Sequence, residues 1–102
     1  MTDEGSLQAE VDAAIAAYES LDGHPATRTK QMLAAHGTVK ALARLVSTGD
    51  LQQGFRTLVD RGRAALTFEA VIIRHAPMFR PEVVEAAKFR LREAGVDPGL
   101  IS

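Results

Sequence analysis

Glycine and proline interrupt this chain at short intervals, and they restrict it to short secondary-structure elements. Gly23, Gly37, Gly62 and Gly95 each follow a run of helix-forming residues, and Pro25 comes two residues after the first of them. Glycine is favoured just beyond the end of a helix, and proline is favoured in the first turn of the next one. The spacing therefore predicts short helices that are joined by tight turns.

Apolar residues recur at intervals of three and four within these segments, as they do on one face of a helix. The clearest stripes lie in 7–21, with Leu7, Val11 and Ala14, and in 81–94, with Val84 and Leu91. Side chains that accept hydrogen bonds from a helix start, at Ser6, Thr38, Asp50 and Thr67, are the predicted N-caps. The predicted helices are 7–21, 26–36, 39–46, 51–61, 68–74 and 81–94.

The segment 68–74 is ambiguous, because the consecutive β-branched residues Val71, Ile72 and Ile73 also favour a strand. A strand needs a partner, and no other part of the chain alternates apolar and polar residues with a period of two. We therefore expect a short buried helix that begins after Thr67 and ends at Pro77.

These elements predict an all-α fold, a compact bundle of about six short helices. The expected organisation is a flexible acidic N-terminus at 1–5, a single helical domain at 6–97 and a C-terminal tail at 98–102. The end of the last helix is the best-defined boundary. There Gly95 suits the left-handed position, and Val96 is expected to fold back on Leu91 in a Schellman motif.

Composition narrows the class of protein. The 102 residues are 46% apolar and 25% charged, which is the balance of an ordinary globular domain. The absence of cysteine excludes disulfides, thiolate zinc sites and cysteine nucleophiles. The start of the chain is acidic, unlike a secretion signal, and no apolar run approaches the roughly 20 residues that span a bilayer. A cytoplasmic protein without a membrane partner is expected.

Charge is distributed unevenly along the chain. Residues 1–22 hold six acidic and no basic side chains, whereas 23–102 hold twelve basic and seven acidic ones. This asymmetry fits a nucleic-acid-binding face with an acidic segment that competes for it. It also fits a helix whose solvated side is acidic, which is the more usual situation.

A polar cluster around 61–80 is the candidate interaction surface. Arginine has a planar fork of donors that suits phosphates and carboxylates. In the alternative reading, Arg61 or Arg63 pairs internally with Asp60 or Glu69, and the remaining side chains are solvated. The candidate residues are Arg61, Arg63, Glu69, Arg74, His75 and Arg80.

No pattern of catalytic or cofactor-binding residues emerges from the sequence. His24, His36 and His75 lie in three different turns, without the spacing that places two metal ligands on one helix face. The glycines are isolated, so no phosphate-binding loop is present. A helix-turn-helix at 29–46 fits poorly, because its second helix offers little besides Lys40 and Arg44 to read bases. We expect no catalytic residues, no metal, no cofactor and no enzyme activity.

The order of the motifs resembles a family of small, uncharacterised bacterial all-helical proteins with the pattern ATRxxQM…HGxV…GFxxLxxxGRxxLTxEA…AxxRL. The likeness covers roughly residues 8–97, and GRxxLTxEA is its most specific part. The chain departs from the pattern at Ala65, where aspartate is usual, and at Arg80, where threonine or serine is usual. The resemblance implies a stand-alone intracellular bacterial domain, and it implies no ligand. The matching positions are Ala26, Thr27, Arg28, Gln31, Met32, His36, Gly37, Gly54, Phe55, Leu58, Gly62, Arg63, Leu66, Thr67, Glu69, Ala70 and Leu91.

These observations favour a small non-enzymatic protein that presents a helical surface to a protein partner or to a second copy of itself. The stripe on 7–21 supports this interpretation, because helices with that spacing also pair across dimers. The alternative is a nucleic-acid-binding accessory protein that uses the basic region 23–102.

Overall fold

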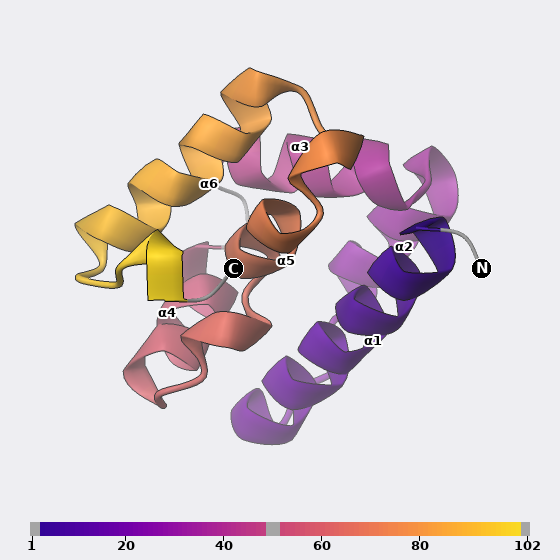
Figure 1. Ribbon diagram of the computed structural model, residues 1–102. Helices are drawn as coiled ribbons and strands as arrows, with labels where there is room; N and C mark the ends of the chain where they lie inside the picture. Colours follow the sequence, from indigo (N-terminus) through magenta and orange to yellow (C-terminus); the bar gives the residue numbers. More distant parts are fainter. Residues whose placement is uncertain (1–2, 49–51, 101–102) are drawn as a thin grey trace.

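The structure, a computed structural model, describes residues 3–48 and 52–100, and these ranges fold into helices (Figure 1). The described ranges contain no strand, which confirms the predicted all-α bundle of about six helices. Within the described ranges there are also three short 3-10 helices: η1 at Ala64–Leu66, η2 at Ala76–Met78 and η3 at Pro98–Leu100. The α-helices are α1 (Asp3–Asp22), α2 (Thr27–His36), α3 (Thr38–Thr48), α4 (Gln52–Asp60), α5 (Phe68–Arg74) and α6 (Pro81–Glu93).

The short helix α5 lies at the centre of the fold, with α1 and α6 on opposite sides of it in the view of Figure 1. It contacts α1, α3 and α6, and five consecutive residues of it, from Glu69 to Ile73, are buried. A helix that is covered on several sides has no solvated face, so its sequence loses the usual amphipathic pattern. This explains why 71–73 also resembles a strand, and it confirms the prediction of a short buried helix.

The apolar stripes of the other helices converge on α5. Leu7 and Val11 of α1 are fully buried, and so are Leu42 of α3 and Leu91 of α6. The stripe predicted on 7–21 therefore faces the core of its own chain. It is not a free surface, so the argument that it pairs across a dimer is wrong.

Thr67 is the N-cap of α5, as predicted. Its hydroxyl oxygen accepts a hydrogen bond from the backbone N–H of Ala70 at 3.1 Å. The same hydroxyl donates to the carbonyl of Ala64 in η1 at 2.8 Å. Because Thr67 is only 1% exposed, this side chain fixes the turn between η1 and α5 within the interior.

Two other predicted caps are wrong. The helix α1 begins at Asp3, so Ser6 lies inside it and residues 3–5 form its first turn. Acidic residues are favoured at a helix start, and they extend this helix instead of preceding it. Thr38 is the first residue of α3; its hydroxyl donates to Gln8, and the carbonyl of Gly37 accepts from Ala41.

The remaining boundaries agree with the predicted ranges to within about two residues, which is the usual uncertainty of helix ends. Helix α2 begins at Thr27, and Ala26 before it makes no side-chain cap. The predicted cap Asp50 lies outside the described residues. The predicted tail contains η3, in which Pro98 is buried and Leu100 is 84% exposed.

The end of α6 is the predicted Schellman motif. The N–H of Val96 donates to the carbonyl of Leu91 at 2.9 Å, and the N–H of Gly95 donates to that of Arg92 at 3.0 Å. Gly95 has φ of 82°, in the left-handed region. Val96 packs on the core and holds the following segment against α6.

We predict that Gly95→Ala lowers the free energy of unfolding by about 1 kcal/mol, because a residue with a Cβ resists the left-handed conformation. A Cβ at this position would meet no atom within 4 Å, so the cost is purely conformational. Urea denaturation measures it. Gly95→Asn is the control and should lose less, because asparagine tolerates positive φ; an alanine variant as stable as the wild type would contradict the motif.

Candidate functional site

The structure separates the six candidate residues into three environments. Arg74 and His75 meet an acidic residue of α1, and Glu69 forms a buried ion pair with α6. Arg61, Arg63 and Arg80 are exposed, and they make no side-chain hydrogen bond or ion pair within the described ranges. The six residues therefore do not form one surface.

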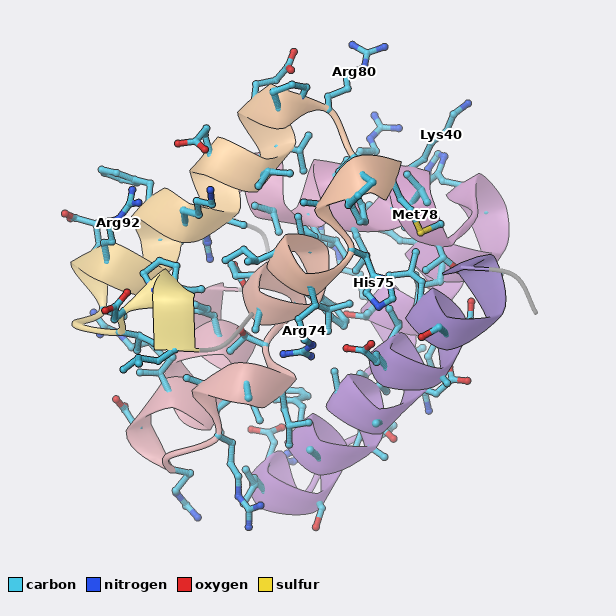
Figure 2. The ribbon with its side chains drawn as sticks, viewed as in Figure 1. Lys40, Arg74, His75, Met78, Arg80 and Arg92 are labelled. Carbon is cyan, nitrogen blue, oxygen red and sulfur yellow. The ribbon has the colours of Figure 1, made fainter. Side chains whose placement is uncertain are left out.

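Glu10 of α1 binds both residues at the end of α5. Its Oε1 accepts a hydrogen bond from Arg74 Nε at 2.7 Å, and its Oε2 lies 2.7 Å from His75 Nε2. Figure 2 shows Arg74 and His75 on the side of α5 that faces α1. His75 is largely buried there, with 11% of its side chain exposed. These contacts fasten the central helix to α1 and leave Arg74 and His75 little freedom to bind an external anion.

The pKa of Glu10 results from opposing effects. Burial raises it, but hydrogen bonds from His75 and Arg74 and the charge of Arg74 outweigh burial, so the pKa falls below its ordinary value. The ionised carboxylate is thus the form that the fold favours.

Glu69 is paired with a residue that the sequence interpretation did not assign to the site. Its Oε2 lies 2.6 Å from Arg90 Nε, and only 5% of the Glu69 side chain is exposed. The guanidinium carbon of Arg90 lies 5.2 Å from the centroid of the Phe55 ring. Burial raises the pKa of Glu69, although the charge of Arg90 acts in the opposite direction. The pair therefore joins α4, α5 and α6 at one point.

The internal pairs that the sequence suggested are not the ones that form. Glu69 was expected to pair with Arg61 or Arg63, which lie close to it in the sequence, but it pairs with Arg90, 21 residues away. One signal was available: Glu69 and Arg90 occupy the charged positions of LTxEA and AxxRL in the family-like pattern. Phe55, of the GF pair in the same pattern, completes the contact.

Two carboxylates of the acidic segment pair with basic residues of the same chain. Besides Glu10, Glu19 of α1 accepts from the backbone N–H of Ala26 at 2.7 Å and pairs with Lys30 at 2.8 Å. These contacts fasten the end of α1 to the start of α2. The charge asymmetry of the sequence thus serves helix packing in part, and it leaves less acidic surface to compete for a basic face.

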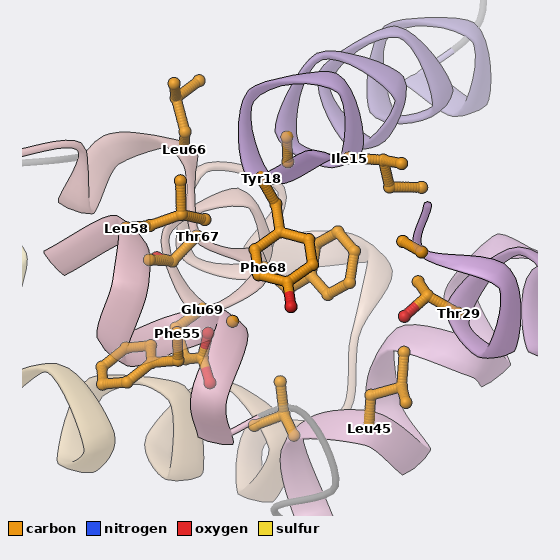
Figure 3. A pocket seen from close by; sticks show the side chains of 14 residues that line it. Ile15, Tyr18, Thr29, Leu45, Phe55, Leu58, Leu66, Thr67, Phe68 and Glu69 are labelled. Carbon is orange, nitrogen blue, oxygen red and sulfur yellow. The ribbon is translucent and has the colours of Figure 1, made fainter. Parts of the chain in front are cut away.

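A cavity of about 190 Å³ lies beside the buried carboxylate, between α1, α2, α3, α4 and α5 (Figure 3). Its wall is mainly apolar, with Ile15, Leu45, Phe55 and Phe68 among the residues that line it. Polar atoms also reach it: the hydroxyls of Tyr18 and Thr29 and the carboxylate of Glu69 point toward the same space (Figure 3). No local pattern in the sequence indicates this site, because its walls come from five separate helices.

The histidines stay apart in the structure. His24 Nδ1 lies 3.3 Å from Asp22, His36 is exposed at the end of α2, and His75 is bound to Glu10. Within the described ranges, no group of three or more histidine or acidic side chains is arranged to hold a metal ion. None of the helices described there is long and apolar enough to cross a membrane.

Comparison of the chain with protein-family models, with curated proteins and with solved structures finds no match. The resemblance to the bacterial family therefore stays a prediction, and the function must be argued from the geometry alone.

We predict that Glu10→Gln lowers the free energy of unfolding by about 1 kcal/mol at about pH 7, because a neutral amide binds the Arg74 guanidinium and the His75 ring less strongly. The folded-state pKa of Glu10 is lowered, so its stabilisation is present above the ordinary value of 4.5 and is lost as the pH falls. The difference between wild type and variant should therefore shrink toward about pH 3.

Denaturation by urea at several pH values measures this difference. Glu93→Gln, at an exposed position of α6, is the matched control, and its free energy of unfolding should follow that of the wild type at every pH. If the difference in free energy of unfolding between the wild type and Glu10→Gln does not depend on pH, the role of the ionised carboxylate is contradicted.

Proposed function

We propose that this protein is a small non-enzymatic interaction protein that associates with a second copy of itself through the outer face of α6. The observation that carries the proposal is the position of its exposed apolar side chains. Among the described residues, the large hydrophobic side chains that stand in water are Phe89, 61% exposed, and Leu100, 84% exposed. Both belong to α6 and to η3, which packs against it.

Phe89 is an anchor of the kind found at the centres of interfaces. Burial of aromatic surface is favourable by about 25 cal/mol per Å², and paired rings gain further energy from their geometry. The outer face of α6 surrounds this ring with charged residues, including Glu85 and Arg92, which are both exposed. An apolar centre within a polar rim is the usual anatomy of an interface.

The charges on this face are complementary to themselves. Glu85 lies one turn before Phe89, and Arg92 lies one turn after it. Glu85 also forms a half-exposed ion pair with Lys88 at 3.4 Å, which an interface would have to exchange or extend. A two-fold axis beside Phe89 would set two α6 helices antiparallel and place Glu85 of each copy opposite Arg92 of the other. Such self-complementarity is the requirement of a two-fold symmetric interface. Arg92 is suited to the role, because it makes no side-chain ion pair within the described ranges and points outward (Figure 2).

Sedimentation equilibrium over about two decades of protein concentration tests the proposal, because a weak dimer shifts its average mass with concentration. We expect Phe89→Ser to give a monomer. Glu85→Arg alone and Arg92→Glu alone should each weaken the dimer, because like charges then face each other, and the double variant should restore it. Lys40→Glu, at an exposed position of α3, is the control and should leave the average mass unchanged.

A constant monomer mass at all concentrations, or no rescue by the double charge exchange, would contradict the dimer. The nucleic-acid alternative is favoured by a separate observation: Lys40 and Arg80 both point outward in the upper part of the view in Figure 2. A monomer whose affinity for duplex DNA falls steeply with salt would support that alternative.

A further inference from the structure

The cavity beside Glu69 has the size of a small aromatic molecule. An engineered protein cavity of about 150 Å³ binds benzene, and this one measures about 190 Å³. The aromatic rings of Tyr18, Phe55 and Phe68 contribute to its wall. A planar ring with one small substituent therefore fits its volume and its mainly apolar lining.

The wall beside α4 is built around a glycine. Gly54 lies within α4, where glycine costs about 1 kcal/mol relative to alanine. A Cβ at this position would lie 3.3 Å from Cε1 of the Tyr18 ring, which is a tight contact. The glycine thus allows Tyr18 of α1 to lie close to α4, and it defines one side of the cavity.

The polar atoms of the cavity select a ligand with a hydrogen-bond donor. Glu69 is 4% exposed, and its carboxylate, when ionised, can only accept. Burial, the charge of Asp22 and a hydrogen bond to the Asp22 side chain raise the pKa of Tyr18, so its phenol keeps its proton and donates a hydrogen bond to Asp22. Thr29, 5% exposed, adds a hydroxyl that points into the same space (Figure 3). A ligand hydroxyl can donate to Glu69 and accept from Thr29.

The ion pair between Glu69 and Arg90 favours a ligand without charge. The carboxylate of Glu69 is already balanced by the guanidinium at 2.6 Å, so the pair carries no net charge. A ligand ammonium would add an uncompensated charge to a mainly apolar space, and that is costly. A neutral hydroxyl satisfies the carboxylate without this cost.

We propose that this cavity binds a small neutral aromatic molecule of about the size of phenol, whose hydroxyl donates a hydrogen bond to Glu69. The site is separate from the outer face of α6, so the proposal does not depend on self-association.

The full chain, labelled with nitrogen-15, is titrated with para-cresol, toluene and benzylamine, and amide NMR shifts report binding. Toluene lacks the hydroxyl, and benzylamine carries a cation at neutral pH. Para-cresol should bind about tenfold more tightly than either, as expected when a ligand hydroxyl pairs with a charged group. The amide shifts should cluster at Tyr18, Thr29 and Gly54.

Ala14→Leu fills the cavity from α1, where Ala14 is 2% exposed, and should weaken para-cresol binding at least about tenfold. Ala13→Leu, the same change at the adjacent exposed position, is the matched control and should bind normally. Equal affinity for para-cresol and toluene would overturn the role of the hydroxyl, and tighter binding of benzylamine would overturn the charge argument. No binding of any of the three by the wild type would remove the site.

Discussion

The buried ion pair between Glu69 and Arg90 is the contact on which the rest of this structure depends. It connects the central helix α5 to α6, and the guanidinium of Arg90 also lies over the ring of Phe55 from α4. An isolated charge in an apolar interior is costly, so each partner requires the other. Arg90 Nη2 is buried without a hydrogen-bond partner among the described residues, which makes the carboxylate the main compensation for this cation.

The same pair affects two features of the molecule, the cavity on its inner side and the exposed face of α6 on its outer side. On the inner side, Glu69 presents a carboxylate acceptor to the cavity. Because Arg90 balances its charge, the ion pair as a whole is neutral. On the outer side, Arg90 is anchored inward, while Phe89 and Arg92 on the same helix are exposed. Phe89 and Arg90 are adjacent in the sequence, but the rotation of the helix between them turns one side chain to the surface and the other to the interior.

Much of the fold follows from local patterns in the sequence. Thr67 and Gly95 act through neighbours within five residues, so their roles at the ends of α5 and α6 were predictable from motifs. The helical stripes gave the buried positions of α1 and α6 for the same reason. The start of α3 was not predictable in this way, because Gly37 serves both α2 and α3 and leaves Thr38 free to bind Gln8 of α1.

The candidate site depended on contacts between distant segments, and there the sequence was a poor guide. Six polar residues within 20 positions suggested one cluster, but helix rotation points them in different directions. Arg74 and His75 bind Glu10, more than 60 residues away, and Glu69 binds Arg90. The charge of an arginine does not show which of several acidic residues it pairs with. A cavity whose walls come from five helices leaves no local pattern in the sequence.

A double-mutant cycle on the central ion pair tests this account most directly. The free energies of unfolding are measured by urea denaturation for the wild type, Glu69→Gln, Arg90→Met and the double variant. If the fold depends on this pair, each single substitution lowers the free energy of unfolding by about 3–5 kcal/mol, because it leaves a buried polar or charged group without its partner. The double variant should then cost clearly less than the sum of the two. Additive losses, or single changes that cost almost nothing, would contradict the account.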